Sequence, residues 1–129
     1  EPYYVVCQNG HDVLAGGQAM DEIVQFDWAI AGFDNYFVQA MPKQMSALLE
    51  QHRFPKFRLF SQAACLDMVR QSNVLTAVPQ SVAMRLLESD DYEGFAFPGD
   101  FRFEVSAASL VESRQDPAMV AMIEALQSE

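Results

Sequence analysis

Two predicted strands, at residues 26–30 and 57–60, are each followed by a short run that could bind a small anion. The residues concerned are Gly32, Phe33, Asp34 and Asn35 after the first strand, and Ser61 and Gln62 after the second. The carboxyl ends of neighbouring parallel strands meet at one edge of a sheet, where helix N-termini present unpaired N–H groups. Those groups favour a carboxylate or another small anion. Ordinary helix capping, by Asp34 in particular, explains the same residues, and the sequence leaves both interpretations open.

Neither of the two histidines belongs to a motif for catalysis or metal binding. His11 follows a turn and His52 closes an apolar helical face, and no HxxxH, HExxH or cysteine–histidine cluster accompanies them. Metal sites need three or four ligands at compatible spacing. No serine lies in a GxSxG motif, and the acidic residues between 90 and 100 lack the order of a calcium-binding loop. We therefore expect no catalytic residue, no metal and no cofactor.

Half of the eight positive charges lie within sixteen residues of one another, at Lys43, Arg53, Lys56 and Arg58. A partner bearing phosphates or carboxylates would fit this cluster. We favour the simpler interpretation, which is a solvated helix face and the loop after it.

The two cysteines, Cys7 and Cys65, are far apart and form no CxxC motif. We expect two reduced thiols in or near the core, with a disulfide or redox pair as the alternative.

The composition describes an acidic globular chain of 129 residues, with a net charge of -10. Nucleic-acid binding depends on cations that displace counterions from phosphates, so this chain is a poor nucleic-acid binder by itself. Half of the residues are hydrophobic, which supports one domain or one lobe of a larger domain. No apolar run reaches the ~18 residues of a membrane helix. Because neither an initiator Met nor a signal peptide opens the chain, we expect a fragment of a longer polypeptide.

The elements that would position the polar residues are clearest between Phe57 and Leu87. Two β-rich runs, at residues 57–60 and 75–78, each lead into an amphipathic segment. The alternation of strand, helix, strand and helix is typical of a parallel α/β sheet.

The remaining segments supply further strands and helices around this unit. Strands are predicted at residues 3–7, 26–30, 92–97 and 101–108, and one or two helical turns at residues 20–25. A helix capped by Asp34 is either kinked at Pro42 or begins there, and Phe54 and Pro55 end it. A last helix begins at Pro117 with Asp116 as its N-cap.

The pattern of the chain resembles the second half of the effector-binding domain of LysR-type transcriptional regulators. The most specific part is LFSQAACLDMVRQSNVLTAVPQSVA, which resembles the family's strand, Leu- and Val-rich helix, strand ending in Pro, and following helix. NGHDVLAGG resembles a Gly-His-Pro-Leu-Ala segment, although Asp12 and Val13 stand where the family usually has Pro. FDWAI resembles the strand before the effector loop, and Ser72 and Asn73 replace the usual glycines.

The resemblance implies a type 2 periplasmic-binding-protein-like fold, in which a Rossmann-like mixed sheet is flanked by helices. Residues 1–100 would form lobe two, and residues 101–129 would form a return strand and a C-terminal helix belonging to lobe one. A DNA-binding helix-turn-helix would lie upstream of this chain.

The function implied by the resemblance is the sensing of a small-molecule effector, expected to be an anion, in the cleft between the lobes. The effector-facing role falls on Gly32, Phe33, Asp34, Asn35, Ser61 and Gln62, with Ser61 as a hydroxyl donor beside a helix N-terminus. The full-length protein would be cytoplasmic, would form dimers or tetramers, and would bind promoter DNA only through its N-terminal domain. The alternatives are a solute-binding protein of a transporter, a small α/β enzyme, and a module for self-association.

Overall fold

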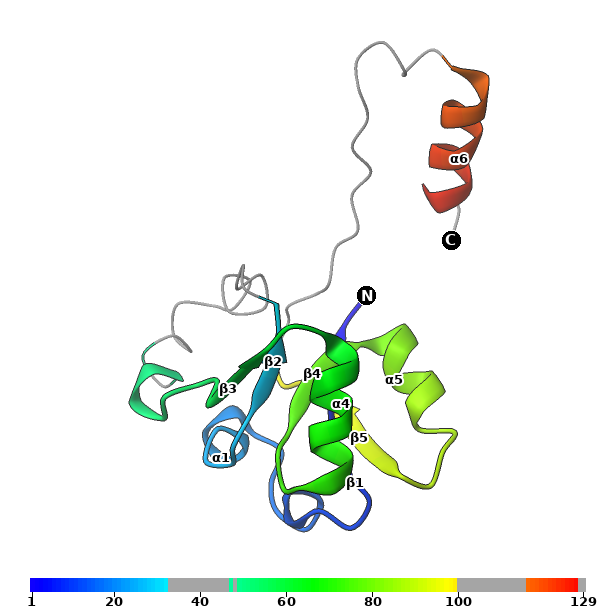
Figure 1. Ribbon diagram of the computed structural model, residues 1–129. Coiled ribbons are helices and arrows are strands. Elements are labelled where there is room, and N and C mark those ends of the chain that lie inside the picture. The colour runs from blue at the N-terminus through cyan, green and yellow to red at the C-terminus, as the bar shows by residue number, and fades with distance from the viewer. Residues whose placement is uncertain (33–46, 48, 100–115, 128–129) are drawn as a thin grey trace.

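The computed structural model describes residues 1–32, 47, 49–99 and 116–127. The described residues before position 100 form a sheet with helices packed on both of its faces (Figure 1). The elements are β1 (Tyr3–Gln8), the 3-10 turn η1 (Asp12–Leu14), α1 (Met20–Ile23), β2 (Ala29–Ala31), β3 (Phe57–Leu59), α4 (Gln62–Gln71), β4 (Thr76–Pro79), α5 (Gln80–Leu86), β5 (Tyr92–Ala96) and α6 (Pro117–Gln127).

Two groups of strands make up the sheet. Strand β1 lies between β4 and β5 and is antiparallel to both, whereas β2 and β3 pair in parallel. The groups meet where Trp28 and Leu75 form a parallel bridge, with N–H groups of Ala29 and Leu75 donating across it at 2.9 and 2.8 Å. The Thr76 hydroxyl adds a buried hydrogen bond of 2.7 Å to the Ala29 carbonyl. The predicted mixed sheet flanked by helices is therefore confirmed.

The strand–helix–strand–helix prediction for residues 57–87 is confirmed by β3, α4, β4 and α5. The strand predicted at residues 26–30 begins later, at Ala29. The N–H of Phe26 donates to the Ile23 carbonyl and so continues the turn that ends α1, which keeps Phe26 out of the sheet. The helical turns expected at residues 20–25 appear as α1.

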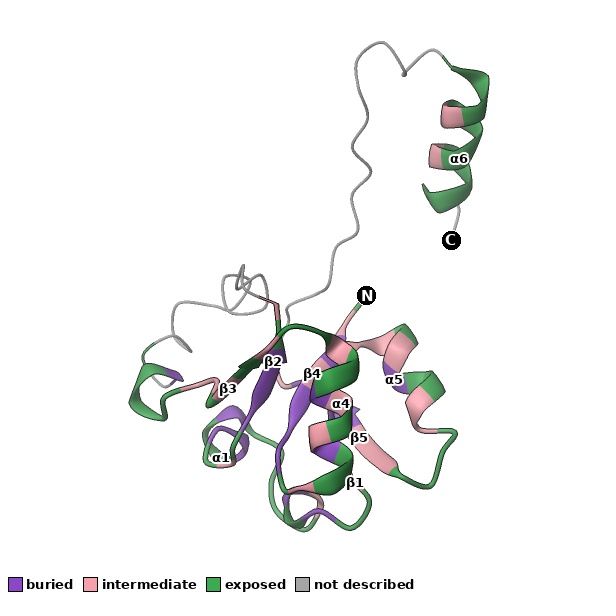
Figure 2. Cartoon of the chain, in the orientation of Figure 1, coloured by how far each residue is buried: buried purple, intermediate pink, exposed green. Residues whose placement is uncertain are grey.

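Side chains on the two faces of the sheet form two separate cores. Figure 2 shows in purple that buried residues lie on β2 and β4. On one face, Val5 and Cys7 pack with α1 and with several aromatic residues, among them the buried Trp28. On the other face, Val6 packs with the apolar sides of α4 and α5, including Cys65. Successive residues of β1 thus point alternately into one core and the other, as the pleat of a strand requires. Both cysteines are buried and free, as expected.

The last helix, α6, begins as the sequence predicts. The carboxylate of Asp116 accepts from the Ala118 N–H at 2.9 Å, and Pro117 occupies the first helical position. No residue of α6 is buried, and Met122 and Leu126 are half exposed.

The strand predicted at residues 101–108 and the question of a kink at Pro42 lie outside the described residues. None of the helices in the described ranges has the length and hydropathy needed to cross a membrane.

Candidate functional site

The ends of β2 and β3 bring two predicted site residues to one edge of the sheet. The parallel register pairs Ala31 with Leu59, so the chain leaves both strands on the same side. The Gly32 N–H donates to the Leu59 carbonyl at 3.0 Å, and Ser61 follows two residues later. The prediction that the two junctions meet is confirmed for Gly32 and Ser61.

The other three residues of the first junction, Phe33, Asp34 and Asn35, lie outside the described residues. Gly32 itself has a φ of 91°, a conformation that side chains with a Cβ rarely adopt. Glycine therefore allows β2 to end in a turn that stays hydrogen-bonded to β3.

Ser61 is the N-cap of α4. Its backbone is extended, and its Oγ accepts from the Ala64 N–H at 3.1 Å, while its carbonyl accepts from the Cys65 N–H at 3.2 Å. The capping interpretation of Ser61 is thus correct. A capping hydroxyl uses a lone pair as acceptor, so its own hydrogen can still be donated to a ligand.

The first turn of α4 offers an electrostatic environment suited to an anion. Gln62 opens the helix and is half-buried, and the first turn contains no acidic residue. N–H groups at the start of a helix have no intrahelical acceptor, and the helix dipole places partial positive charge there. The Ser61 hydroxyl and this helix start can together hydrogen-bond a carboxylate.

Phe60 is a residue at this edge that the sequence placed only inside a strand. Strand β3 ends at Leu59, and the Phe60 side chain is 87% exposed directly before Ser61. The sequence did not predict this exposure, because a phenylalanine at the end of an apolar run is usually assigned to the core. Its position puts an aromatic surface beside the polar groups of the edge.

His11 has a structural role, away from this edge. The ring is 3% exposed, Nδ1 accepts from the Val13 N–H at 2.9 Å, and Nε2 donates to the Asn73 carbonyl at 2.7 Å. A neutral imidazole satisfies both bonds, and it ties the loop after β1 to the turn before β4. Within the described ranges, no three His, Cys, Asp or Glu side chains gather in a way that could hold a metal ion.

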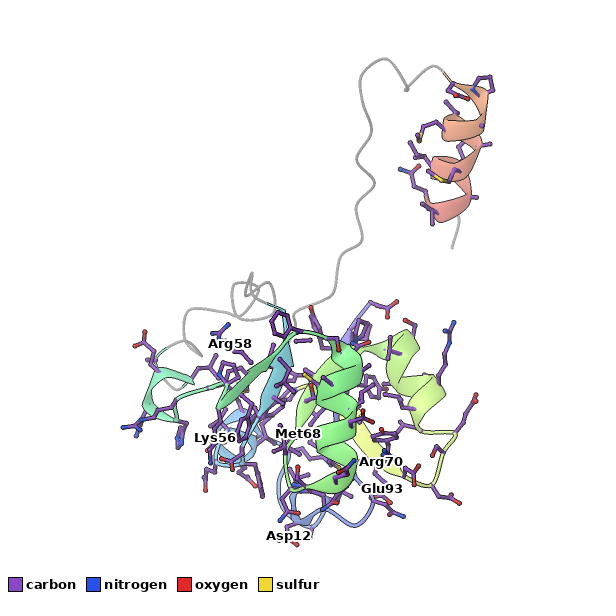
Figure 3. All side chains as sticks on the ribbon, in the orientation of Figure 1. Asp12, Lys56, Arg58, Met68, Arg70 and Glu93 are labelled. Atoms are coloured by element: carbon purple, nitrogen blue, oxygen red, sulfur yellow. The ribbon has the colours of Figure 1, made fainter. Side chains whose placement is uncertain are left out.

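Of the cationic cluster, Arg53, Lys56 and Arg58 lie in the described part of the chain. Lys56 precedes β3 and forms an ion pair with Asp27 at 3.1 Å, whereas Arg58 lies further along the strand (Figure 3). Lys43 lies outside the described residues. The opposite end of β2 and β3 from Ser61 holds a cavity of about 530 Å³, to which Arg53 and Lys56 contribute.

Comparisons with known proteins match this chain to a family along its whole length. Residues 1–129 match the family described as LysR substrate binding domain. A search of curated proteins found no match.

Solved structures share the fold at low sequence identity. One, described as a transcriptional regulator from Vibrio parahaemolyticus, has a TM-score of 0.69 and 15% identity, over 98% of this chain and 59% of that one. A variant of the OxyR2 regulatory domain from Vibrio vulnificus has a TM-score of 0.56 and 17% identity, over 78% of this chain and 48% of that one. The chain therefore spans about half of each of these structures.

Proposed function

The chain belongs to the LysR substrate-binding domain family, and we propose that it binds its effector at the edge formed by the carboxyl ends of β2 and β3. The observation that carries this proposal is the hydrogen bond of 3.0 Å from the Gly32 N–H to the Leu59 carbonyl, which holds both junctions at one edge. Ligands of open α/β sheets bind at such an edge.

The proposed effector is a small anion. Ser61 would donate its hydroxyl hydrogen while it continues to cap α4, and Gln62 would contribute from the first turn. Gly32, Phe33, Asp34 and Asn35 would form the adjoining wall. The second wall would come from lobe one, so that residues 1–100 act as lobe two and residues 101–129 return to lobe one. No catalytic step belongs to this proposal.

The regulatory role would follow from linkage between two conformations. An effector shifts a conformational equilibrium only by its difference in affinity for the two states. In the full-length protein, which we propose to be a cytoplasmic dimer or tetramer, closure of the lobes on the effector would change how an N-terminal helix-turn-helix sits on promoter DNA. The acidic residues 1–129 would not contact the DNA.

Substitutions at Ser61 in the full-length protein separate capping from effector binding. Ser61→Thr keeps the cap and the hydroxyl and should keep the response of a promoter reporter. Ser61→Asp keeps the cap but places a negative charge at the edge, and it should abolish the response to an anionic effector. Ser61→Ala should weaken the effector response about tenfold, the loss expected for one charge-assisted hydrogen bond.

Affinity for promoter DNA without effector should change little in all three variants. Ser89→Ala is the matched control, because its hydroxyl accepts from the Asp91 N–H in a turn elsewhere on the surface. A full response from Ser61→Asp would contradict the proposal and leave Ser61 as a helix cap alone.

A further inference from the structure

The second feature of β2 and β3 is the cavity at their amino ends. It has a volume of about 530 Å³, and its lining includes Phe26, Trp28, Arg53, Phe54 and Lys56. Cavities of this size are typical of small-molecule sites. Trp28 to Gly32 is four residues of extended chain, so the cavity is roughly 13 Å from the edge that carries Ser61.

Aromatic rings give the cavity a rigid apolar wall. The rings of Trp28 and Phe54 lie 5.2 Å apart between centroids, at an angle of 57°. Trp28 is only 1% exposed, and its Nε1 donates to the Ile23 carbonyl at 2.9 Å, which fixes the orientation of the indole. The buried indole therefore supports Phe54 from behind, and a planar ligand ring would pack against the half-buried Phe26 and Phe54.

The charges around the cavity leave one positive charge in excess. Lys56 is held by Asp27, and its Nζ also lies 5.5 Å from the centroid of the Phe57 ring. Arg53, by contrast, has no ion pair with another residue in the described part of the chain. A guanidinium binds a carboxylate with two parallel hydrogen bonds.

The backbone at Arg53 is unusual for an arginine. The helical residues 49–51 lie directly before it and end in a Schellman motif. In this motif the Phe54 N–H donates to the Leu49 carbonyl at 2.9 Å, and the Arg53 N–H donates to the Glu50 carbonyl at 3.1 Å. Arg53 occupies the left-handed position of this motif, with a φ of 54°, where glycine is the usual residue. A charged side chain is thus kept at the cavity despite an unfavourable backbone conformation, which is a pattern found at functional sites.

We propose that this cavity binds a small aromatic monocarboxylate, with the ring against Phe26 and Phe54 and the carboxylate on Arg53. One unneutralised guanidinium matches one carboxylate, and the paired Lys56 closes the rim. The site is separate from the edge that carries Ser61, and it does not depend on the function proposed for that edge.

Benzoate is the probe, and the protein is the full 129-residue chain. Trp28 is the only tryptophan and its ring lies against Phe54, so its fluorescence is sensitive to a ligand that packs on Phe54. Benzoate should change the fluorescence saturably, and equilibrium dialysis with radiolabelled benzoate should give the same dissociation constant. Acetate, which has no ring, and benzyl alcohol, which has no charge, should each bind at least about tenfold more weakly.

Two variants at Arg53 and two controls locate the site. Arg53→Met and Arg53→Gly should each weaken benzoate binding about tenfold or more, since both remove the guanidinium and the glycine also relieves the backbone. Arg85→Met on α5 and Ser61→Ala should leave binding unchanged. The proposal fails if benzoate does not bind, if both Arg53 variants bind as tightly as the original chain, or if Ser61→Ala removes the binding.

Discussion

At the scale of single residues, the two thiols show how burial controls reactivity in this chain. Burial, together with a smaller effect of the nearby Glu93 carboxylate, raises the pKa of Cys7 to about 11. Burial also raises the pKa of Cys65, although a hydrogen bond with Thr76 opposes the shift. The cysteines serve different cores, on opposite faces of the sheet. Neither can therefore act as an exposed thiolate or pair with the other.

Alkylation should confirm this account of the cysteines. Since both pKa values are raised, the thiolate fraction at about pH 8 is smaller in the folded chain than in the unfolded chain. We expect iodoacetamide to label neither cysteine of the native protein at that pH. Both should be labelled in denaturant without a reductant, as mass spectrometry would show. Protection that persists in denaturant would reveal a disulfide and contradict the structure.

Arg53 offers a second test at the residue scale. A left-handed conformation costs an ordinary residue about 1–2 kcal/mol, while glycine adds about 0.5–1 kcal/mol of backbone entropy to the unfolded state. Arg53→Gly should therefore raise the free energy of unfolding by roughly 0.5–1 kcal/mol, measured by urea denaturation. Arg53→Ala should give no such gain. A loss of stability in the glycine variant would show that Arg53 contributes contacts that outweigh its backbone conformation.

At the scale of elements, the joint between the two groups of strands depends on Thr76. Its hydroxyl is buried and donates to the Ala29 carbonyl at 2.7 Å, which connects β4 to β2 beside a single backbone bridge. The position of β2, and with it Gly32, follows from this joint.

Thr76→Val keeps the shape of the side chain and removes only the hydroxyl. We expect it to lower the free energy of unfolding by about 1–2 kcal/mol, because the Ala29 carbonyl loses a buried partner. Thr76→Ser retains the hydroxyl and should lose less of this hydrogen-bond contribution. Equal stability of the valine variant and the original chain would show that the hydroxyl does not hold the joint.

Sequence patterns predicted the elements better than their arrangement. The run from Phe57 to Leu87 carries its signals locally, in β-rich residues, a capping serine and amphipathic spacing, and its four elements were confirmed. The central place of β1, antiparallel to both β4 and β5, was not predicted, since it depends on pairing between residues about 70 to 90 positions apart. Strand β2 begins later than predicted because the N–H of Phe26 donates to the Ile23 carbonyl in the turn that ends α1.

The candidate site was predictable to a similar degree. Ser61 and Gln62 stand out because a polar residue follows a strand and precedes a helix, and Gly32 because it ends an apolar run. Arg53 was noticed only as one charge in a cluster. Its left-handed backbone and its place at a cavity depend on the Schellman motif and on the packing of Phe54 against Trp28, which no spacing in the sequence reveals.

At the scale of the whole molecule, the described surfaces suit a lobe that requires a partner. Phe60 is 87% exposed at the proposed effector edge, and α6 presents Met122 and Leu126 at 50% and 58% exposure. An upstream lobe one would cover both features in the full-length protein if residues 101–129 return to it. Self-association through the same apolar surface would be the outcome in its absence.

The most direct test of an effector-sensing regulator is the coding sequence upstream of Glu1 in the parent gene. We predict a further stretch that opens with a basic helix-turn-helix pattern and continues into the strands and helices of lobe one. A secretory signal, a charged segment followed by an apolar one, would contradict the account. The protein would then bind its solute outside the cytoplasm for a transporter, and it would have no role in binding promoter DNA.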